Sequence, residues 1–135
     1  MRRTNLIVSV LACYLLSVSD AFAEWLEIGR NATKTVYVDV NTIKITGNKS
    51  RIWRLINHNK VIVVPDGTEY RSAKTLQEFD CLNLSSRLVY VVAFKELMGQ
   101  GKVIAAGYQP VIWDANVPDS ISEKISKYAC SNKLK

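Results

Sequence analysis

The sequence predicts an α+β fold, in which a single antiparallel sheet of about six strands carries a C-terminal helix on one face, stapled by a disulfide. Three observations support this prediction. Segments rich in β-branched and aromatic residues alternate with turn clusters along most of the chain, which is typical of strands and hairpins. Helical periodicity is found only near the C-terminal end, and two cysteines, Cys81 and Cys130, follow a hydrophobic leader.

The leader has the three parts of a secretory signal peptide. Arg2 and Arg3 form the positive region, residues 6–18 are almost entirely apolar, and an Ala-Phe-Ala triplet precedes the expected cleavage between Ala23 and Glu24. An uncleaved anchor is the alternative, but about 13 apolar residues span only about 20 Å as a helix, against about 30 Å of hydrocarbon. The sequence therefore predicts export, to the periplasm, the cell surface or the medium.

Lipidation at Cys13 is a second alternative, because residues 10–13 (Val-Leu-Ala-Cys) loosely resemble a lipobox. A lipobox cysteine normally closes the apolar region, whereas this apolar run continues through Leu16. We therefore expect membrane association only if Cys13 is lipidated.

Removal of the signal peptide, residues 1–23, leaves residues 24–135, which are 112 residues and enough for one small domain. Cys81 and Cys130 are its only cysteines, and disulfides persist in exported proteins. A bond between them would stabilise the fold by about 4 kcal/mol in the chain-entropy model. A reactive or metal-binding pair is the alternative, but the sequence has no Cys-x-x-Cys, and a zinc site needs about four ligands whereas the only histidine is His58. We therefore predict no metal and no cofactor.

Four strand segments are predicted in the first half of the domain, at residues 25–28, 35–40, 51–57 and 61–64. The last of them ends at a Pro-Asp-Gly turn, and a Gly-Asn-Lys-Ser turn precedes the third. In the third segment, alternation places Trp53 and Leu55 on one face and Arg54 on the other, between two isoleucines.

The second half adds three strand segments, at residues 73–81, 88–95 and 102–108. Gly-Gln-Gly at residues 99–101 predicts a hairpin between the last two, because a phosphate loop would need a third glycine and a strand-to-helix setting. Spacing also predicts that four aromatic side chains fill the core of the sheet: Trp53, Tyr90, Phe94 and Trp113.

The one predicted helix begins near a capping box, Ser-Ile-Ser-Glu at residues 120–123, shortly after Pro118. Ile121, Ile125 and Tyr128 form an apolar stripe that must pack on the sheet. On the helical wheel Cys130 lies roughly opposite Ile121, so we expect Cys130 beyond the last regular turn.

The predicted mature domain is moderately basic. Without Arg2, Arg3 and Asp20 the chain has 16 Lys and Arg against 11 Asp and Glu, a net charge of +5. These charges are scattered, which favours an ordinary solvated surface, and export argues against nucleic acid as a partner. The basic loop residues that we select as a candidate binding surface are Lys34, Lys49, Arg51 and Arg71.

Catalysis is not predicted, because the residues supply no nucleophile with an activating base. His58 has polar neighbours and is expected on a loop without a functional role. Asp39 and Asp80 lie in or after apolar segments, where we expect their carboxylates to accept hydrogen bonds from backbone amides. A deep pocket lined by any of the three would instead favour a small secreted enzyme.

Residues along the whole predicted mature domain, in this order, carry a resemblance to one family. They are Trp25, Tyr37-Val38-Asp39, Ile52-Trp53-Arg54-Leu55, Ser72, Glu78-Phe79-Asp80-Cys81, Met98-Gly99-Gln100-Gly101, Trp113, Val117-Pro118 and Cys130. The ordered set resembles the bacterial surface-adhesin protein E-like family. This resemblance implies an antiparallel sheet with a C-terminal helix held on one face by a disulfide, and adhesion to host extracellular-matrix proteins.

The sequence thus predicts a secreted, periplasmic or surface-exposed non-enzymatic binding domain, adhesin-like, that recognises an extracellular-matrix or envelope protein. A periplasmic structural or assembly factor is the alternative. An unpaired sheet edge can also accept a second copy of the chain, so a homodimer is a secondary expectation.

Overall fold

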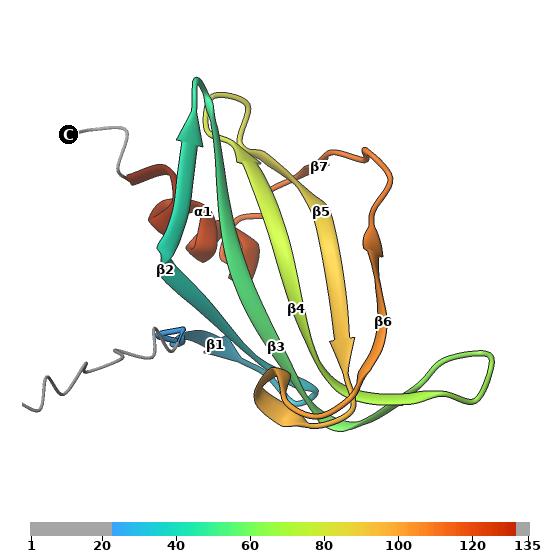
Figure 1. Cartoon of the computed structure of the whole chain (residues 1–135). Helices are drawn as coiled ribbons and strands as arrows, with labels where there is room; N and C mark the ends of the chain where they lie inside the picture. The colour runs from blue at the N-terminus through green and yellow to red at the C-terminus, as the bar shows by residue number, and fades with distance from the viewer. Residues whose placement is uncertain (1–22, 132–135) are drawn as a thin grey trace, which may run out of the picture.

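The computed structural model describes residues 23–131, so residues 1–22 of the predicted signal peptide, including Cys13, lie outside the described residues. Six strands are named β1 (Leu26–Arg30), β2 (Lys34–Thr46), β3 (Lys49–Val63), β4 (Glu69–Asp80), β5 (Ser85–Phe94) and β6 (Val103–Tyr108). Each pairs antiparallel with the next, so the sheet is a meander in the order β1-β2-β3-β4-β5-β6 (Figure 1).

Three further elements complete the described fold. The 3₁₀ turn η1 (Leu97–Gly99) joins β5 to β6, and the two-residue strand β7 (Asp114–Ala115) pairs with the start of β5. Helix α1 (Ile121–Ser131) crosses one face of the sheet behind β2 and β3 (Figure 1). The α+β prediction, with one antiparallel sheet and a C-terminal helix, is confirmed.

Two predicted strands are one in the structure. β3 is a 15-residue strand that includes the predicted segment 51–57 and all of the predicted segment 61–64 except its last residue. The polar residues between them stay extended because the turn between β1 and β2 binds them: the Asn59 amide N–H donates to the Thr33 carbonyl at 2.9 Å, and the Asn59 side chain donates to the Ala32 carbonyl at 2.9 Å. His58 therefore lies in a strand, and its predicted position on a loop is wrong.

The core lies between α1 and the sheet. Each of its fully buried side chains is at most 1% exposed, and they are Val36, Val38, Ile52, Phe79, Ile125 and Ala129. These residues come from β2, β3, β4 and α1, and Ile121 packs against them, so the predicted contact of Ile121 and Ile125 with the sheet is confirmed. Tyr128, the third residue of the predicted stripe, is 43% exposed, so its predicted packing on the sheet is wrong; the next residue, Ala129, is buried there instead. At about 25 cal/mol per Å² of buried apolar area, this layer supplies the main driving force for folding.

The N-terminus of α1 is capped by side chains. The Glu123 amide N–H donates to the Ser120 hydroxyl at 3.1 Å, as the capping box predicts. The Glu123 carboxylate accepts from the amide N–H of Asp119 at 2.7 Å. In a standard capping box the donor is the N-cap residue itself, which here is Ser120. Asp119 has a φ of 61°, which turns its N–H toward the helix.

The predicted disulfide joins Cys81, directly after β4, to Cys130, with the two Cα atoms 5.8 Å apart. Cys130 lies inside α1, so its predicted position beyond the last regular turn is wrong. The reason is that the last turn of the helix rests on the sheet: Ala129 is fully buried, and the Ser50 hydroxyl donates to the Ala129 carbonyl. Cys130 therefore reaches the end of β4 while it stays helical.

The four aromatic side chains that the sequence predicts in the core, Trp53, Tyr90, Phe94 and Trp113, do not belong to it. Residues paired across antiparallel strands share a face, and Trp53 pairs with Leu76, which pairs with Tyr90, on the face opposite Ile52 and Phe79. Phe94 is on the same face, and Trp113 is 36% exposed, so the prediction that the four aromatics fill the core is wrong. We call this second side, which α1 does not cover, the helix-free face.

Candidate binding site on the helix-free face

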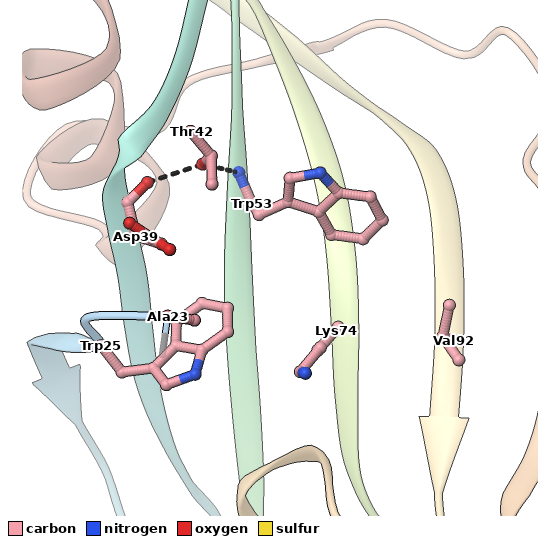
Figure 2. A pocket seen from close by; sticks show the side chains of 7 residues that line it. All are labelled: Ala23, Trp25, Asp39, Thr42, Trp53, Lys74 and Val92. Carbon is pink, nitrogen blue, oxygen red and sulfur yellow. Dashed lines mark hydrogen bonds between the residues drawn. The ribbon is translucent and has the colours of Figure 1, made fainter. Parts of the chain in front are cut away.

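A pocket of about 250 Å³ opens on the helix-free face. Strands β2 to β5 and the segment before β1 line it, with the residues Ala23, Trp25, Asp39, Thr42, Trp53, Lys74 and Val92 (Figure 2). We call it the aromatic pocket, because two indole rings and the aliphatic Val92 provide most of its apolar wall. It is a concave apolar site with a few polar groups, which is the usual composition of a binding pocket.

Lys74 supplies a positive charge beside the apolar wall. Its Nζ lies 5.8 Å from the ring centroid of Trp25 and 5.3 Å from that of Phe94. Trp53 packs edge to face on Tyr90, with ring centroids 6.4 Å apart, which fixes the orientation of its indole. Figure 2 shows Trp25, Trp53 and Lys74 around one hollow, so the pocket suits an apolar group.

A break in the pairing of β2 with β3 forms the polar wall of the pocket. The register shifts between Asp39 and Lys44, and Thr42 fills the gap. The Thr42 hydroxyl donates to the Asp39 carbonyl at 2.6 Å and accepts from the Trp53 amide at 3.0 Å (Figure 2). The Asp39 carboxylate accepts from the Asn41 amide at 3.0 Å, so the expected hydrogen bond of Asp39 to the backbone is confirmed.

The turn around η1 folds over the same face and restricts Lys74. The Ser72 hydroxyl, which is fully buried, donates to the Glu96 carbonyl and accepts from the Gly99 amide at 2.9 Å. Gly99 has a φ of +65°, and a Cβ there would collide with the Lys74 side chain. The positive φ favours glycine at this position, and another residue would also displace the end of the Lys74 side chain.

Beyond the pocket, toward the turn between β2 and β3, the face is charged. Glu78 is 5% exposed and accepts from Arg51 Nε at 2.5 Å and from Arg87 Nε at 2.8 Å. The Trp113 ring covers two cations, with its centroid 5.5 Å from the Arg87 Cζ and 5.4 Å from the Lys49 Nζ. Burial acts to raise the pKa of Glu78, but the hydrogen bonds from the two arginines outweigh it and the pKa lies below its usual value.

We expect Glu78→Gln to lower the free energy of unfolding by about 2 kcal/mol at pH 7, because it leaves Arg87 partly buried without a carboxylate partner. The carboxylate has a lower pKa in the folded state, so its contribution is present above the unfolded pKa and is lost as the pH falls through the folded pKa. The difference between wild type and variant should therefore shrink below about pH 4.

Urea unfolding of both proteins between pH 3 and pH 7 measures this difference. Glu27→Gln is the control, because its partner Arg30 is 70% exposed and such pairs contribute little. A difference that stays constant over the whole pH range would show that the Glu78 carboxylate is not the stabilising group.

The four residues of the predicted basic surface lie in strands, so their predicted position in loops is wrong, and they are divided between the two ends of the sheet. Lys49 and Arg51 line a hollow of about 320 Å³ together with Lys44, Thr46 and Glu78. At the other end, Lys34 pairs with His58, which lies seven residues beyond Arg51 on β3. Arg71 lies at the same end, because the next residue along β4 pairs with Asn57. At about 3.3 Å per residue this separation exceeds 20 Å. Sequence reasoning missed Lys44, because it follows the register break and not a recognisable turn.

The three candidate catalytic residues do not converge. Asp39 lines the aromatic pocket, whereas His58 lines a separate hollow beside Lys60 and packs edge to face on Tyr70 at 5.5 Å. Burial and then the charge of Lys34 lower the pKa of His58. Asp80 accepts from the amides of the turn that follows it, at 3.1 and 3.0 Å, as expected.

Within residues 23–131 no group of three or more His, Cys, Asp or Glu side chains is placed to hold a metal ion. No helix in the same range is long and apolar enough to cross a membrane.

The model of the family described as Surface-adhesin protein E matches residues 25–131, which is most of the chain. The chain belongs to this family. The match covers every strand, the disulfide and α1, so the resemblance seen in the sequence is confirmed. None of the curated proteins compared with the chain matches it.

Solved structures of protein E share the fold. Crystal form II of Haemophilus influenzae protein E has a TM-score of 0.67 at 21% sequence identity, with 86% of this chain and 94% of that chain covered. Protein E from non-typeable Haemophilus influenzae has a TM-score of 0.64 at 20% identity, with 86% and 81% covered. At this identity the similarity concerns the sheet, the helix and their connections.

Proposed function

We propose that this member of the surface-adhesin protein E family is an exported, non-enzymatic binding domain that recognises a protein partner through its helix-free face. Family membership over residues 25–131 is the observation that carries the proposal. Export is supported by the form of residues 1–23 and by the disulfide between Cys81 and Cys130. Cleavage before Glu24 would remove Ala23 from the aromatic pocket and widen its entrance, and the intact mass of exported protein tests this step.

The helix-free face has the composition of a protein interface. Tryptophan, tyrosine and arginine contribute most to binding energy in such interfaces, and this face contains Trp25, Trp53 and Arg51. The aromatic pocket suits an apolar side chain of the partner, and the hollow beside Lys44 and Lys49 suits an acidic one. An extracellular-matrix or envelope protein with an acidic, partly apolar surface fits both.

Self-association through β6 is a secondary proposal. Within the described residues β6 pairs only with β5, and its terminal residues Val103 and Tyr108 are 50% and 83% exposed. An unpaired edge of this kind can pair with the same strand of a second copy. Light scattering on the purified domain distinguishes a monomer from such a dimer.

Two variants of the helix-free face test the proposal against a panel of purified extracellular-matrix and envelope proteins. Trp25→Ala removes one wall of the aromatic pocket, and Lys44→Glu combined with Lys49→Glu reverses the charge of the hollow. We expect each to weaken binding by about 10-fold or more, because both remove groups at the centre of the contact. Only the charge variant should also reduce the dependence of binding on salt.

Matched controls lie on other surfaces. Tyr128→Ala removes an aromatic side chain that is 43% exposed on α1, and Lys124→Glu combined with Lys127→Glu makes the same charge change on the exposed side of α1. Both should bind like wild type. Binding that depends on Tyr128 but not on Trp25 would place the interface on the helix side, and a panel without any binder would contradict an adhesin-type role.

A further inference from the structure

A positive charge interrupts the apolar face beneath the helix. On β3, Ile52, Arg54 and Ile56 point to the same side, and Ile52 belongs to the core. The Arg54 Nε donates to the Thr75 hydroxyl at 2.7 Å, but within residues 23–131 no ion pair includes Arg54. Burial lowers the pKa of Arg54 to about 10. Arg54 is partly buried, so its guanidinium loses part of its hydration without gaining a carboxylate partner.

Arg54 lines a hollow of about 330 Å³, between β4, β5, β7 and the first turn of α1. The other polar groups on its wall include Gln77, Ser86 and Ser122, of which Gln77 is 4% and Ser86 is 6% exposed. The Gln77 Nε2 donates to the Ser86 hydroxyl at 3.1 Å and to the Ser122 hydroxyl at 3.3 Å. This hollow lies on the helix side of the sheet, away from the aromatic pocket.

One atom of this polar wall has no partner. The Gln77 Oε1 is buried and accepts no hydrogen bond from any described residue. A half-turn of the amide would place its NH₂ group there instead, with two donors directed away from the serines. Buried polar groups are satisfied in almost all folded proteins, so an unpartnered amide beside an unpaired guanidinium indicates a place for a polar ligand.

The surrounding charges select the kind of ligand. Arg87 also lines the hollow, but its guanidinium is bound by Glu78 and stacked on Trp113. Asp114 lies on the wall and disfavours an ion with two or more negative charges, such as phosphate or sulfate. A carboxylate has one charge, and its two oxygens match the flat fork of Arg54.

We propose that this hollow binds a carboxylate group, with Arg54 as the main ligand and with Gln77 and Ser122 as hydrogen-bonding partners. The carboxylate belongs either to a small organic acid or to the C-terminus of a polypeptide, because both present the same group. This site does not rest on the proposed function: the Arg87 side chain borders both, but Arg54, Gln77 and Ser122 lie on the helix side of the sheet.

Amide NMR titrations of the oxidised domain test the proposal with sodium acetate, with a short peptide that has a free C-terminus and with the same peptide amidated. Sodium chloride keeps the ionic strength constant. We expect saturable shifts at Gln77 and Ser122 with acetate or the free peptide and none with the amidated peptide. A tighter complex with acetate indicates a small acid, and a tighter complex with the free peptide indicates a polypeptide C-terminus.

Arg54→Gln should weaken binding by about 10- to 100-fold, which is the usual effect of losing a charge-assisted pair of hydrogen bonds. Arg71→Gln is the matched control and should bind like wild type, because Arg71 is a partly buried arginine on β4 that does not line the hollow. If Arg54→Gln does not fold, Arg54→Lys keeps the charge, loses the fork and should still bind about 10-fold more weakly.

Three results would overturn the proposal. They are the absence of saturable shifts with both carboxylates, equal affinity in wild type and the Arg54 variant, and tighter binding of inorganic phosphate than of acetate. The aromatic pocket variant Trp25→Ala should leave carboxylate binding unchanged, so a failure here is distinguishable from a failure of the proposed function.

Discussion

Cys130→Ser should lower the free energy of unfolding by about 2 to 5 kcal/mol. The bond closes a separation of 49 residues, and a loop of this size restricts the unfolded chain strongly. It also holds the last turn of α1 on the sheet, where Ala129 is fully buried. Because a small domain has a total stability of about 5 to 15 kcal/mol, this one bond is a large part of it.

Urea unfolding of the oxidised wild type and of the variant measures the effect. Cys81→Ser and the double variant should be as unstable as Cys130→Ser, because each removes the same bond. Wild type treated with a reducing agent should unfold at the midpoint of the variants. Equal stability of oxidised and reduced wild type would show that the bond contributes nothing.

Phe79→Ala should cost about 3 to 5 kcal/mol, the usual range for a buried phenylalanine. Phe79 is fully buried on β4 and belongs to the cluster that joins the sheet to Ile125 and Ala129 of α1. Its removal would leave a cavity under the helix, which tight packing around it can fill only partly.

Thermal and urea unfolding measure this loss, with Leu82→Ala as the control. Leu82 is 68% exposed in the turn after β4, so its truncation should change stability by less than about 0.5 kcal/mol. Combined with Cys130→Ser, Phe79→Ala should cost less than the sum of the two single changes, because both loosen the same contact of α1. A small effect of Phe79→Ala, similar to that of Leu82→Ala, would contradict the assignment of the core.

The two sides of the sheet differ in whether they contribute mainly to stability or to binding. The side under α1 contains the disulfide and the fully buried cluster, and changes there alter stability. The helix-free face contains partly exposed aromatic and charged side chains, together with the fully buried Leu55 and the buried carboxylates of Asp39 and Glu78. Binding variants at Trp25, Lys44 and Lys49 can therefore be compared at nearly equal stability.

The sequence by itself determined the elements that depend on local chemistry. Alternating β-branched residues predicted the strands, Pro-Asp-Gly and Gly-Gln-Gly predicted two of the turns, and the capping box at Ser120 predicted the start of α1. Two cysteines in an exported chain predicted the disulfide. Each of these signals lies within a few residues or in a simple count, so no knowledge of distant neighbours was needed.

Tertiary structure alone decided which face of each strand the helix covers. Alternation along β3 predicts that Ile52 and Trp53 lie on opposite faces of the sheet, but it does not show which of the two faces the helix covers. The four aromatic side chains were therefore assigned to the wrong face. The aromatic pocket depends on a register break near Asp39, and the hollow at Arg54 depends on where α1 begins. Cys130 stays helical because the sheet supports the last turn of α1. These features arise from pairing and packing between residues far apart in the chain, which local periodicity does not encode.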